Sequence, residues 1–273
     1  MKHLPVVALI CLAVAAPVSG QTFAAASPSV PAVEAPSLLA PPTSSDTVSP
    51  RTPFPAPKPG HGALFAPLGQ DFARFFSTDT AKMVGVFAVA ALFAHPADQQ
   101  SVDTASANLT KGMAHAGNTG GGVLMQLSGG LATYAVGRAT GNREVATVGG
   151  EIFRAQILSQ AMVQTTKFIV QRERPDGSNS VSFPSGHTAS AFATATVVQQ
   201  HYGWKAGIPA YALAGAVSAS RLASSKHYLS DVLVGAGIGI ASGRAVTFKV
   251  GREKFALGAA PTDGGAMVTF TKR

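Results

Sequence analysis

Three short stretches decide how this chain is interpreted: KFIVQRERP at 167–175, FPSGH at 183–187 and SRLASSKHYLSD at 220–231. Each one stands near the predicted end of an apolar helical segment. Taken singly, each has an ordinary interpretation, namely a basic helix end, a serine-capped helix start and a helical His–Asp pair. Their order and close spacing along the chain therefore carry the functional hypothesis, because no single stretch is decisive.

The first stretch combines two cations with a proline. Lys167 and Arg174 are seven residues apart, so on a helix they project toward nearly the same side. Pro175 disfavours helix at the preceding residue, so we expect the Arg174 side chain to leave from a helix end. Two cations aimed at one place suit the oxygens of a phosphate, which arginine can bind bidentately.

The second stretch opens a helix. Ser185 is a typical N-cap residue, and a helix N-terminus offers free N–H groups and partial positive charge to an anion. Gly186 allows an anion to approach the backbone closely. His187 would lie beside that anion with a side chain suited to proton transfer near neutral pH.

The third stretch places a histidine and an aspartate four residues apart. On one helix His227 and Asp231 would be neighbours. A carboxylate on one imidazole nitrogen fixes the tautomer and leaves the other nitrogen free to attack. Arg221 adds a third cation to the set.

In this order the three stretches resemble the tripartite motif of the type 2 phosphatidic acid phosphatase (PAP2) superfamily: K-x6-RP, PSGH and SR-x5-H-x3-D. Every fixed position of the motif is present between residues 167 and 231. That superfamily also contains bacterial nonspecific acid phosphatases, lipid phosphatases and vanadium haloperoxidases. The resemblance implies an all-α fold, a helical bundle of the PAP2/haloperoxidase type.

The resemblance also implies a role for each motif residue. His227 would be the nucleophile that forms a phosphohistidine, Asp231 would orient it, and His187 would protonate the leaving oxygen. The remaining motif residues would hold the phosphoryl oxygens: Lys167, Arg174, Ser185, Gly186 and Arg221. With three cations and a helix N-terminus to neutralise the phosphate, the resemblance implies neither a metal ion nor a cofactor.

Hydrophobic periodicity places helices on both sides of the motifs. A helical pattern starts near residue 66 and is followed by predicted helices at 83–94, 123–137, 151–170, 188–202, 208–221 and 228–246. Four glycines in the last of these are expected to allow close packing against a neighbouring helix: Gly235, Gly237, Gly239 and Gly243. The helical phosphatase domain is predicted over 61–250, and a small C-terminal β-hairpin over 251–273.

The N-terminal part has a different character. Residues 1–20 have a short basic start and an apolar run that is too short to span a bilayer, as in a secretory signal peptide. Residues 21–60 are rich in proline, alanine and serine, which is typical of a disordered linker. The sequence thus predicts an exported, periplasmic protein.

Composition narrows the partners. Hydrophobic residues make up 46% and charged residues 12% of the chain, and the net charge is +8. No dense run of lysine and arginine appears, which disfavours nucleic acid and leaves an anionic substrate or a membrane surface. No predicted helix offers about 20 cleanly apolar residues, so a soluble or surface-bound domain is favoured over an integral one.

The leading hypothesis is an acid phosphatase that needs no metal and acts on phosphomonoesters or lipid phosphates. The alternatives are a vanadate-dependent haloperoxidase, an integral-membrane lipid (di)phosphate phosphatase and a phosphate-binding protein without catalysis. Lys226, just before the motif histidine, is expected to be a solvated loop lysine. His95 and His201 show no paired ligand spacing and are interpreted as structural or surface residues.

Overall fold

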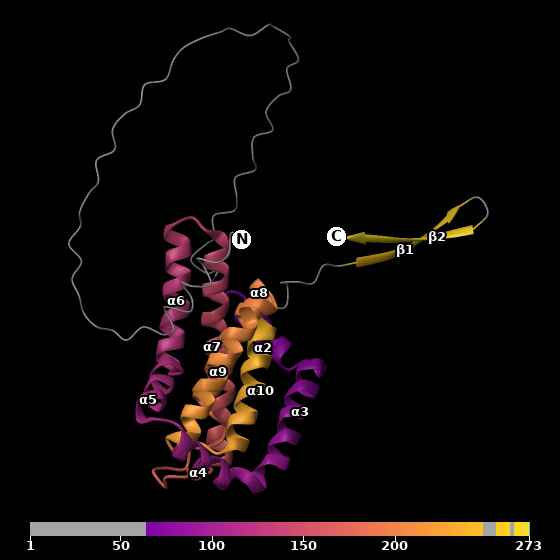
Figure 1. Ribbon diagram of the computed structural model, residues 1–273. Coiled ribbons are helices and arrows are strands. Elements are labelled where there is room, and N and C mark those ends of the chain that lie inside the picture. The colour runs from indigo at the N-terminus through magenta and orange to yellow at the C-terminus, as the bar shows by residue number, and fades with distance from the viewer. Residues whose placement is uncertain (1–63, 248–254, 263–264, 273) are drawn as a thin grey trace, which may run out of the picture.

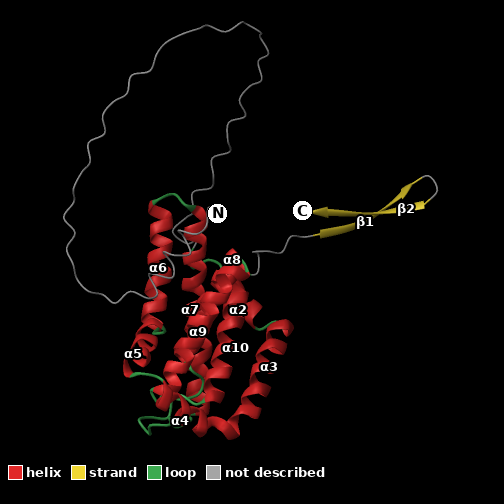
Figure 2. Cartoon of the chain, viewed as in Figure 1, coloured by secondary structure: helices red, strands yellow, loops and turns green. Residues whose placement is uncertain are grey.

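A computed structural model describes residues 64–247, 255–262 and 265–272 of the chain. The predicted signal peptide (1–20) and linker (21–60) lie outside the described residues. From residue 64 to residue 247 the chain consists of helices joined by turns and one longer loop (Figure 2). The prediction of an all-α helical bundle is confirmed.

The helices stand roughly side by side, with α8 and α10 in the middle of the bundle (Figure 1). Their bounds are α2 (Leu68–Phe75), α3 (Thr78–Ala94), the 3-10 turn η2 (His95–Ala97), α4 (Asp98–Asn108), α5 (Lys111–Gly120), α6 (Val123–Ala139), α7 (Arg143–Val170), α8 (Gly186–Tyr202), α9 (Trp204–Ala223) and α10 (Leu229–Val246).

Close packing between α8 and α10 forms the centre of the fold. A Cβ atom added at Gly235 would lie 2.6 Å from the Ser185 carbonyl oxygen, and one at Gly239 would lie 2.3 Å from the Ala189 carbonyl oxygen. Gly243 approaches Thr196 in the same way. The expectation of close helix packing at these glycines is confirmed, and it brings α10 directly against the first turn of α8.

Two helices were not predicted from the sequence, α4 and α5. Their sequences, DQQSVDTASAN and KGMAHAGNTG, carry few large apolar side chains and so do not stand out as apolar segments. Pro96 does end α3 at Ala94, but the chain passes through η2 directly into α4. Helix α9 also begins four residues earlier than predicted and accommodates Pro209 in its interior.

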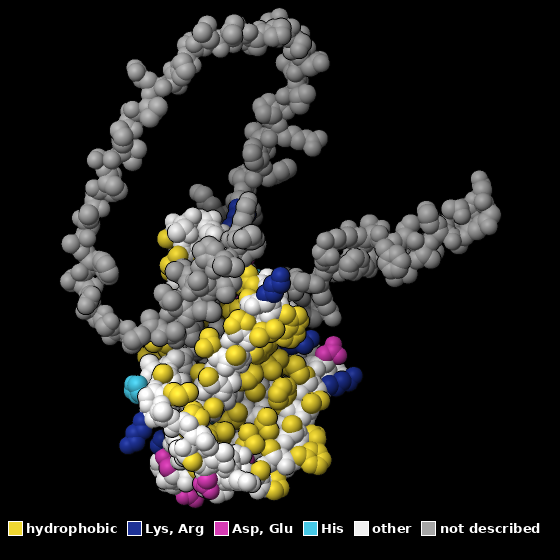
Figure 3. All heavy atoms as spheres, viewed as in Figure 1, with side chains coloured by type: hydrophobic (Ala, Val, Ile, Leu, Met, Phe, Trp, Pro, Cys, Tyr) yellow, Lys and Arg dark blue, Asp and Glu magenta, His cyan; other side chains and the backbone are white. Residues whose placement is uncertain are grey.

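Many large apolar side chains on the outer helices are exposed. They are Val86, Val89, Leu92 and Phe93 on α3, Leu124, Leu131 and Val136 on α6, and Trp204, Ile208 and Leu213 on α9. Figure 3 shows apolar atoms spread across the middle of one face, with charged side chains near its edges. We call these ten side chains the outer apolar surface.

Within the part of the chain that the structure describes, two helical segments are long and apolar enough to cross a membrane, judged by length and composition alone. They are Thr78–Asn108, with a mean hydropathy of 1.4, and Leu229–Val246, with 1.3. No such segment was expected from the sequence, because the predicted helix covered only 83–94, whereas helical structure runs from Thr78 to Asn108. In the best window of Thr78–Asn108 only 6% of the residues are buried, against 78% in Leu229–Val246, which is a core helix.

The C-terminal strands form the predicted hairpin. Strand β1 (Phe255–Thr262) pairs antiparallel with β2 (Gly265–Lys272), and Ala260 stands opposite Met267.

Candidate active site

The three motif stretches meet at one end of the bundle. The loop 171–185 leaves α7 there and runs to α8, beside the turn that connects α9 to α10 (Figure 1). Main-chain hydrogen bonds tie these segments together: Asp176 N donates to Ser225 O (3.1 Å), and Ser185 N donates to Asp231 O (3.0 Å). These bonds hold the loop 171–185 against the α9–α10 turn and the start of α10.

The two cations of the first stretch lie on different elements. Helix α7 ends at Val170, and Gln171 takes a left-handed conformation with φ of 47°. Lys167 is buried in the last turn, where its Nζ donates to the Val181 carbonyl oxygen. Arg174 lies beyond the helix in the loop, as the proline predicted, and its side chain is half-buried.

Both motif arginines keep donor capacity. The buried Nε atoms of Arg174 and Arg221 have no hydrogen-bond partner among the described residues. Arg221 also donates through Nη1 to the Asn118 side-chain oxygen (2.5 Å). Because an unpaired buried donor is costly, these two nitrogens indicate that an acceptor such as an oxyanion completes the site.

Ser185 precedes α8 as its N-cap residue, but its hydroxyl does not cap the helix amides. It accepts a hydrogen bond from Thr188 Oγ1 at 3.0 Å instead. A hydroxyl that accepts in this way keeps its own proton for another acceptor. Ser185 and Gly186 are buried, and the free amides of the first turn of α8 lie beside them.

His187 follows in that first turn. Burial lowers the pKa of its imidazole to about 4, and the positive charges of Arg221, His227 and Arg174 act in the same direction. A hydrogen bond to the backbone of Asn118 opposes this effect. A bound dianion would offset the surrounding positive charge and raise the pKa again.

His227 lies outside α10, which begins at Leu229, so His227 and Asp231 are not neighbours on one helix as the sequence suggested. Its Nδ1 lies 2.6 Å from the Ser182 carbonyl oxygen and 3.8 Å from Asp231 Oδ2. A carbonyl oxygen only accepts hydrogen bonds, so this contact assigns the ring proton to Nδ1 and leaves the Nε2 lone pair free. Burial lowers the pKa of His227, while Asp231 raises it.

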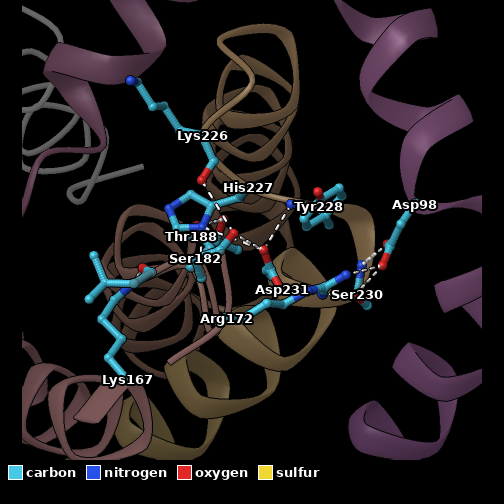
Figure 4. Close-up of polar contacts among 12 residues, drawn as sticks. Asp98, Lys167, Arg172, Ser182, Thr188, Lys226, His227, Tyr228, Ser230 and Asp231 are labelled. Atoms are coloured by element: carbon cyan, nitrogen blue, oxygen red, sulfur yellow. Dashed lines mark hydrogen bonds and ion pairs between the residues drawn. The ribbon is translucent and has the colours of Figure 1, made fainter. Parts of the chain in front are cut away.

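The Asp231 carboxylate organises the turn around this histidine (Figure 4). Its Oδ2 accepts from Ser182 Oγ and from Tyr228 N at 2.8 Å, which also caps the start of α10. Its Oδ1 accepts from Arg172 Nη1 at 2.7 Å. Asp231 thus reaches His227 mainly through Ser182, which bonds both residues.

Sequence reasoning missed four residues that shape this site: Asp98, Asn118, Arg172 and Ser182. Arg172 could have been noticed as a further guanidinium inside the first stretch. Asp98 and Asn118 lie on α4 and α5, which were not predicted from the sequence because they carry few large apolar side chains.

Lys226 is not a free loop lysine. Its Nζ forms a hydrogen bond and ion pair with Asp176, and this bond lowers the pKa of that carboxyl. The pair links the loop 171–185 to the turn that carries His227. Among the described residues, no cluster of three His, Cys, Asp or Glu side chains could hold a metal ion.

Comparisons with known proteins agree with this arrangement. Residues 150–254 match the family model of the PAP2 superfamily. A lipid A 1-phosphatase of Porphyromonas gingivalis is 42% identical over 89 residues, which is 32% of this chain and 20% of that protein. A lipid A 4'-phosphatase of Helicobacter pylori is 36% identical over 63 residues, which is 23% of this chain and 32% of that protein.

The matched residues thus span a third or less of these curated relatives. Among solved structures, a transmembrane PAP2 type phosphatidylglycerolphosphate phosphatase from Bacillus subtilis superposes with a TM-score of 0.42 at 20% identity. That superposition covers 70% of this chain and 98% of the other.

Proposed function

We propose that this protein is a phosphatase of the PAP2 type that hydrolyses the phosphate group of a lipid, and the match of residues 150–254 to the PAP2 superfamily model supports the proposal. One observation carries the proposal. Two imidazoles, His187 and His227, share a site with three cations, Lys167, Arg174 and Arg221, and the charges of these groups act on one another. A phosphoryl group fits such a site, because its transfer needs charge on the oxygens to be stabilised.

In the proposed reaction, His227 Nε2 attacks the phosphorus atom. The P–N bond forms as the bond to the lipid oxygen breaks, and His187 gives its proton to that oxygen. Water then attacks the phosphohistidine and passes a proton to His187. Cleavage of the P–N bond releases inorganic phosphate and restores both imidazoles.

The proposed roles follow from where each group lies. Ser182 holds the proton on His227 Nδ1, which keeps the lone pair on Nε2. Lys167, Arg174 and Arg221 supply positive charge, and Ser185 with the α8 amides supplies hydrogen-bond donors. We propose that these groups neutralise the phosphate without a metal ion.

The proposed substrate is a lipid because of the surface next to the site. Phe168 and Ile169 directly follow Lys167 and are 81% and 73% exposed. The outer apolar surface lies on α3, α6 and α9, and exposed apolar side chains of this kind suit contact with acyl chains. The matched relatives are named as lipid A phosphatases, which supports a lipid phosphate over a soluble phosphomonoester.

We also propose that the protein is associated with a membrane through this outer apolar surface. The segment Thr78–Asn108 is long and apolar enough to cross a bilayer, and few of its residues are buried in the bundle. From the signal-like sequence of residues 1–20 we propose that the active site lies on the periplasmic side of that membrane.

The test is a substrate panel on the full chain purified in detergent. Phosphatidate, lipid A, a polyprenyl diphosphate and a soluble aryl phosphate are compared for phosphate release, with and without EDTA. We expect lipid phosphates to be hydrolysed fastest, without loss in EDTA, and His227→Ala to lose activity by a factor of at least about 1,000.

Samples quenched with denaturing detergent at alkaline pH, after incubation with radiolabelled substrate, should contain a phosphoenzyme in the wild type and none in His227→Ala, and the label should be lost when the pH is lowered. Unchanged phosphate release by His227→Ala would falsify the proposal. Peroxide-dependent halide oxidation in the presence of vanadate, at a rate above phosphate release, would favour the haloperoxidase alternative.

A further inference from the structure

The Asp231 carboxylate is held by groups other than His227. Its four close contacts are Arg172 Nη1, Ser182 Oγ, Tyr228 N and, at the longer distance of 3.8 Å, His227 Nδ1. Arg172 is the one cation among these. The motif roles do not explain why a further guanidinium is directed at the carboxylate that organises the histidine.

Arg172 is fixed on three sides (Figure 4). Its Nη1 donates to Asp231 Oδ1 and to Ser230 Oγ, both at 2.7 Å, and its Nη2 donates to Asp98 Oδ2 at 2.8 Å. The guanidinium also lies over the ring of Tyr228, with its carbon 4.2 Å from the ring centre. A side chain held by two carboxylates and an aromatic face has little freedom to move.

The backbone of Arg172 takes part as well. Its carbonyl oxygen accepts from Ser182 N at 2.9 Å, and Ser182 O in turn accepts from His227 Nδ1. Arg172 therefore reaches His227 by two routes, one through the side chain of Asp231 and one through the backbone of Ser182.

Asp98 anchors this arrangement from α4. It is 5% exposed, and its Oδ1 accepts from Ser230 N at 2.8 Å, which caps the first turn of α10. Its Oδ2 accepts from Ser230 Oγ at 2.7 Å as well as from Arg172. His95 Nδ1 contacts the same carboxylate at 2.9 Å. Asp98 lies outside the residues that match the family model, which begin at 150.

We infer that Arg172 and Asp98 are positioning residues for the reaction, because they hold Asp231 and Ser182 in the arrangement that orients His227. The inference rests on the proposed phosphatase function. Neither residue touches the proposed phosphate position, so each acts through Asp231 and Ser182 on the imidazole.

Arg172 and Asp98 carry opposite charges, so neutralising one or the other should affect the protonation of His227 in opposite directions. The titratable and charged groups around His227 are Lys167 on α7, His187 on α8, Arg221 on α9, Asp231 on α10 and Arg172 on the loop, with Asp98 on α4 behind Arg172. Removing the positive charge of Arg172 leaves Asp231 unneutralised and favours the imidazolium. Removing the negative charge of Asp98 leaves Arg172 uncompensated and disfavours it.

The experiment measures kcat and KM from pH 4 to 8 for Arg172→Gln, Arg172→Lys and Asp98→Asn in the full chain in detergent, on the lipid phosphate that the wild type hydrolyses best. Arg143→Gln, an exposed arginine at the start of α7, is the matched control. We expect kcat to fall about 10- to 100-fold in Arg172→Gln with little change in KM, because orientation is lost and phosphate contacts are kept.

The acidic limb of kcat/KM should move to higher pH in Arg172→Gln and to lower pH in Asp98→Asn, each by about half a unit or more. Arg172→Lys keeps the charge but cannot reach both carboxylates, so it should keep the wild-type limb and lose kcat. Arg143→Gln should match the wild type in both respects.

Two outcomes would overturn the inference while the wild type is active. One is wild-type kcat in all three variants. The other is a loss of kcat in Arg172→Gln and Asp98→Asn while the acidic limb of kcat/KM stays in place or moves in the same direction in both variants. That result would indicate that the two residues only support the fold. If Arg172→Gln does not fold, Asp98→Asn and Arg172→Lys decide between these outcomes. An inactive wild type counts against the proposed function instead.

Discussion

Replacing Gly235 with alanine tests whether the packing of α10 on α8 holds the candidate site in shape. A Cβ at this position would lie 2.6 Å from the Ser185 carbonyl oxygen, whereas ordinary contacts begin at 3.4 Å. The contacting atom belongs to the backbone of the N-cap residue of α8, so no side-chain rotation relieves the clash. The two segments must separate by about 0.8 Å, because interiors are close-packed.

The size of the effect follows from this displacement. Overpacking of a core by one methyl group costs about 1–3 kcal/mol, and the better helix propensity of alanine returns about 0.5–1 kcal/mol. We therefore expect a net loss of about 1–2 kcal/mol in the free energy of unfolding. Since a misplacement of about 1 Å can reduce a rate about 100-fold, kcat should fall about 10- to 100-fold.

Gly215→Ala is the control for this substitution. Gly215 lies on the exposed side of α9, and a Cβ there would meet no atom within 4 Å. This variant should keep wild-type kcat and unfold at the same or a slightly higher temperature. Phosphate release and thermal unfolding in detergent are measured for both variants side by side. Wild-type kcat and stability in Gly235→Ala would show that α10 does not constrain the Ser185 turn.

Three further predictions concern single groups. Asn118→Ala should lower kcat/KM about 10- to 100-fold, because the hydrogen bond that fixes Arg221 is lost. Steady-state kinetics measure this, with Ser106→Ala as the control. Equal kcat/KM values in the two variants would contradict the prediction. The pKa of His187 is lowered from 6.5 to about 4, so between these pH values the unfolded state binds more protons than the folded state. The free energy of unfolding should therefore fall as pH falls from about 6.5 to about 4, by up to about 1.4 kcal/mol per pH unit. Thermal unfolding at pH 5 and pH 7 tests this, and the difference should shrink in His187→Gln. Ile169→Ser should raise KM for a lipid phosphate in mixed micelles while leaving hydrolysis of a soluble aryl phosphate unchanged, and an equal effect on both substrates would contradict a lipid contact.

The sequence could predict that the motif residues lie close together, because most of them stand at the ends of predicted helices. Ser185 and His187 are placed by the start of one helix, and Lys167 by the end of another, so the positions of helix ends were enough to bring them together. The individual hydrogen bonds between these residues could not be predicted from the sequence. The sequence suggested a direct His227–Asp231 contact, but α10 begins only at Leu229, and the nearer partner of Nδ1 is a backbone carbonyl.

The outer helices show a different limit. Hydrophobic periodicity identified α6 and most of α3 and α9, yet several of their largest apolar side chains are exposed. A pattern of apolar residues indicates that a helix has an apolar face, but it does not tell whether protein or lipid covers that face. The expectation of a soluble domain treated every apolar face as core, whereas the exposed apolar side chains support the proposed membrane association.

Helices α4 and α5 explain why the motif alone gives an incomplete site. Asn118 supplies the acceptor for the buried Arg221, and Asp98 supplies a carboxylate for the half-buried Arg172. Both lie before residue 150, where the match to the family model begins. Within 150–254 alone, Arg221 would lose its Asn118 acceptor, which is costly for a buried guanidinium, and Arg172 would keep Asp231 but lose Asp98. We therefore expect other chains that carry the same three motifs to provide equivalent acceptors, and a structural comparison should look for them on the helices that cover this end of the bundle.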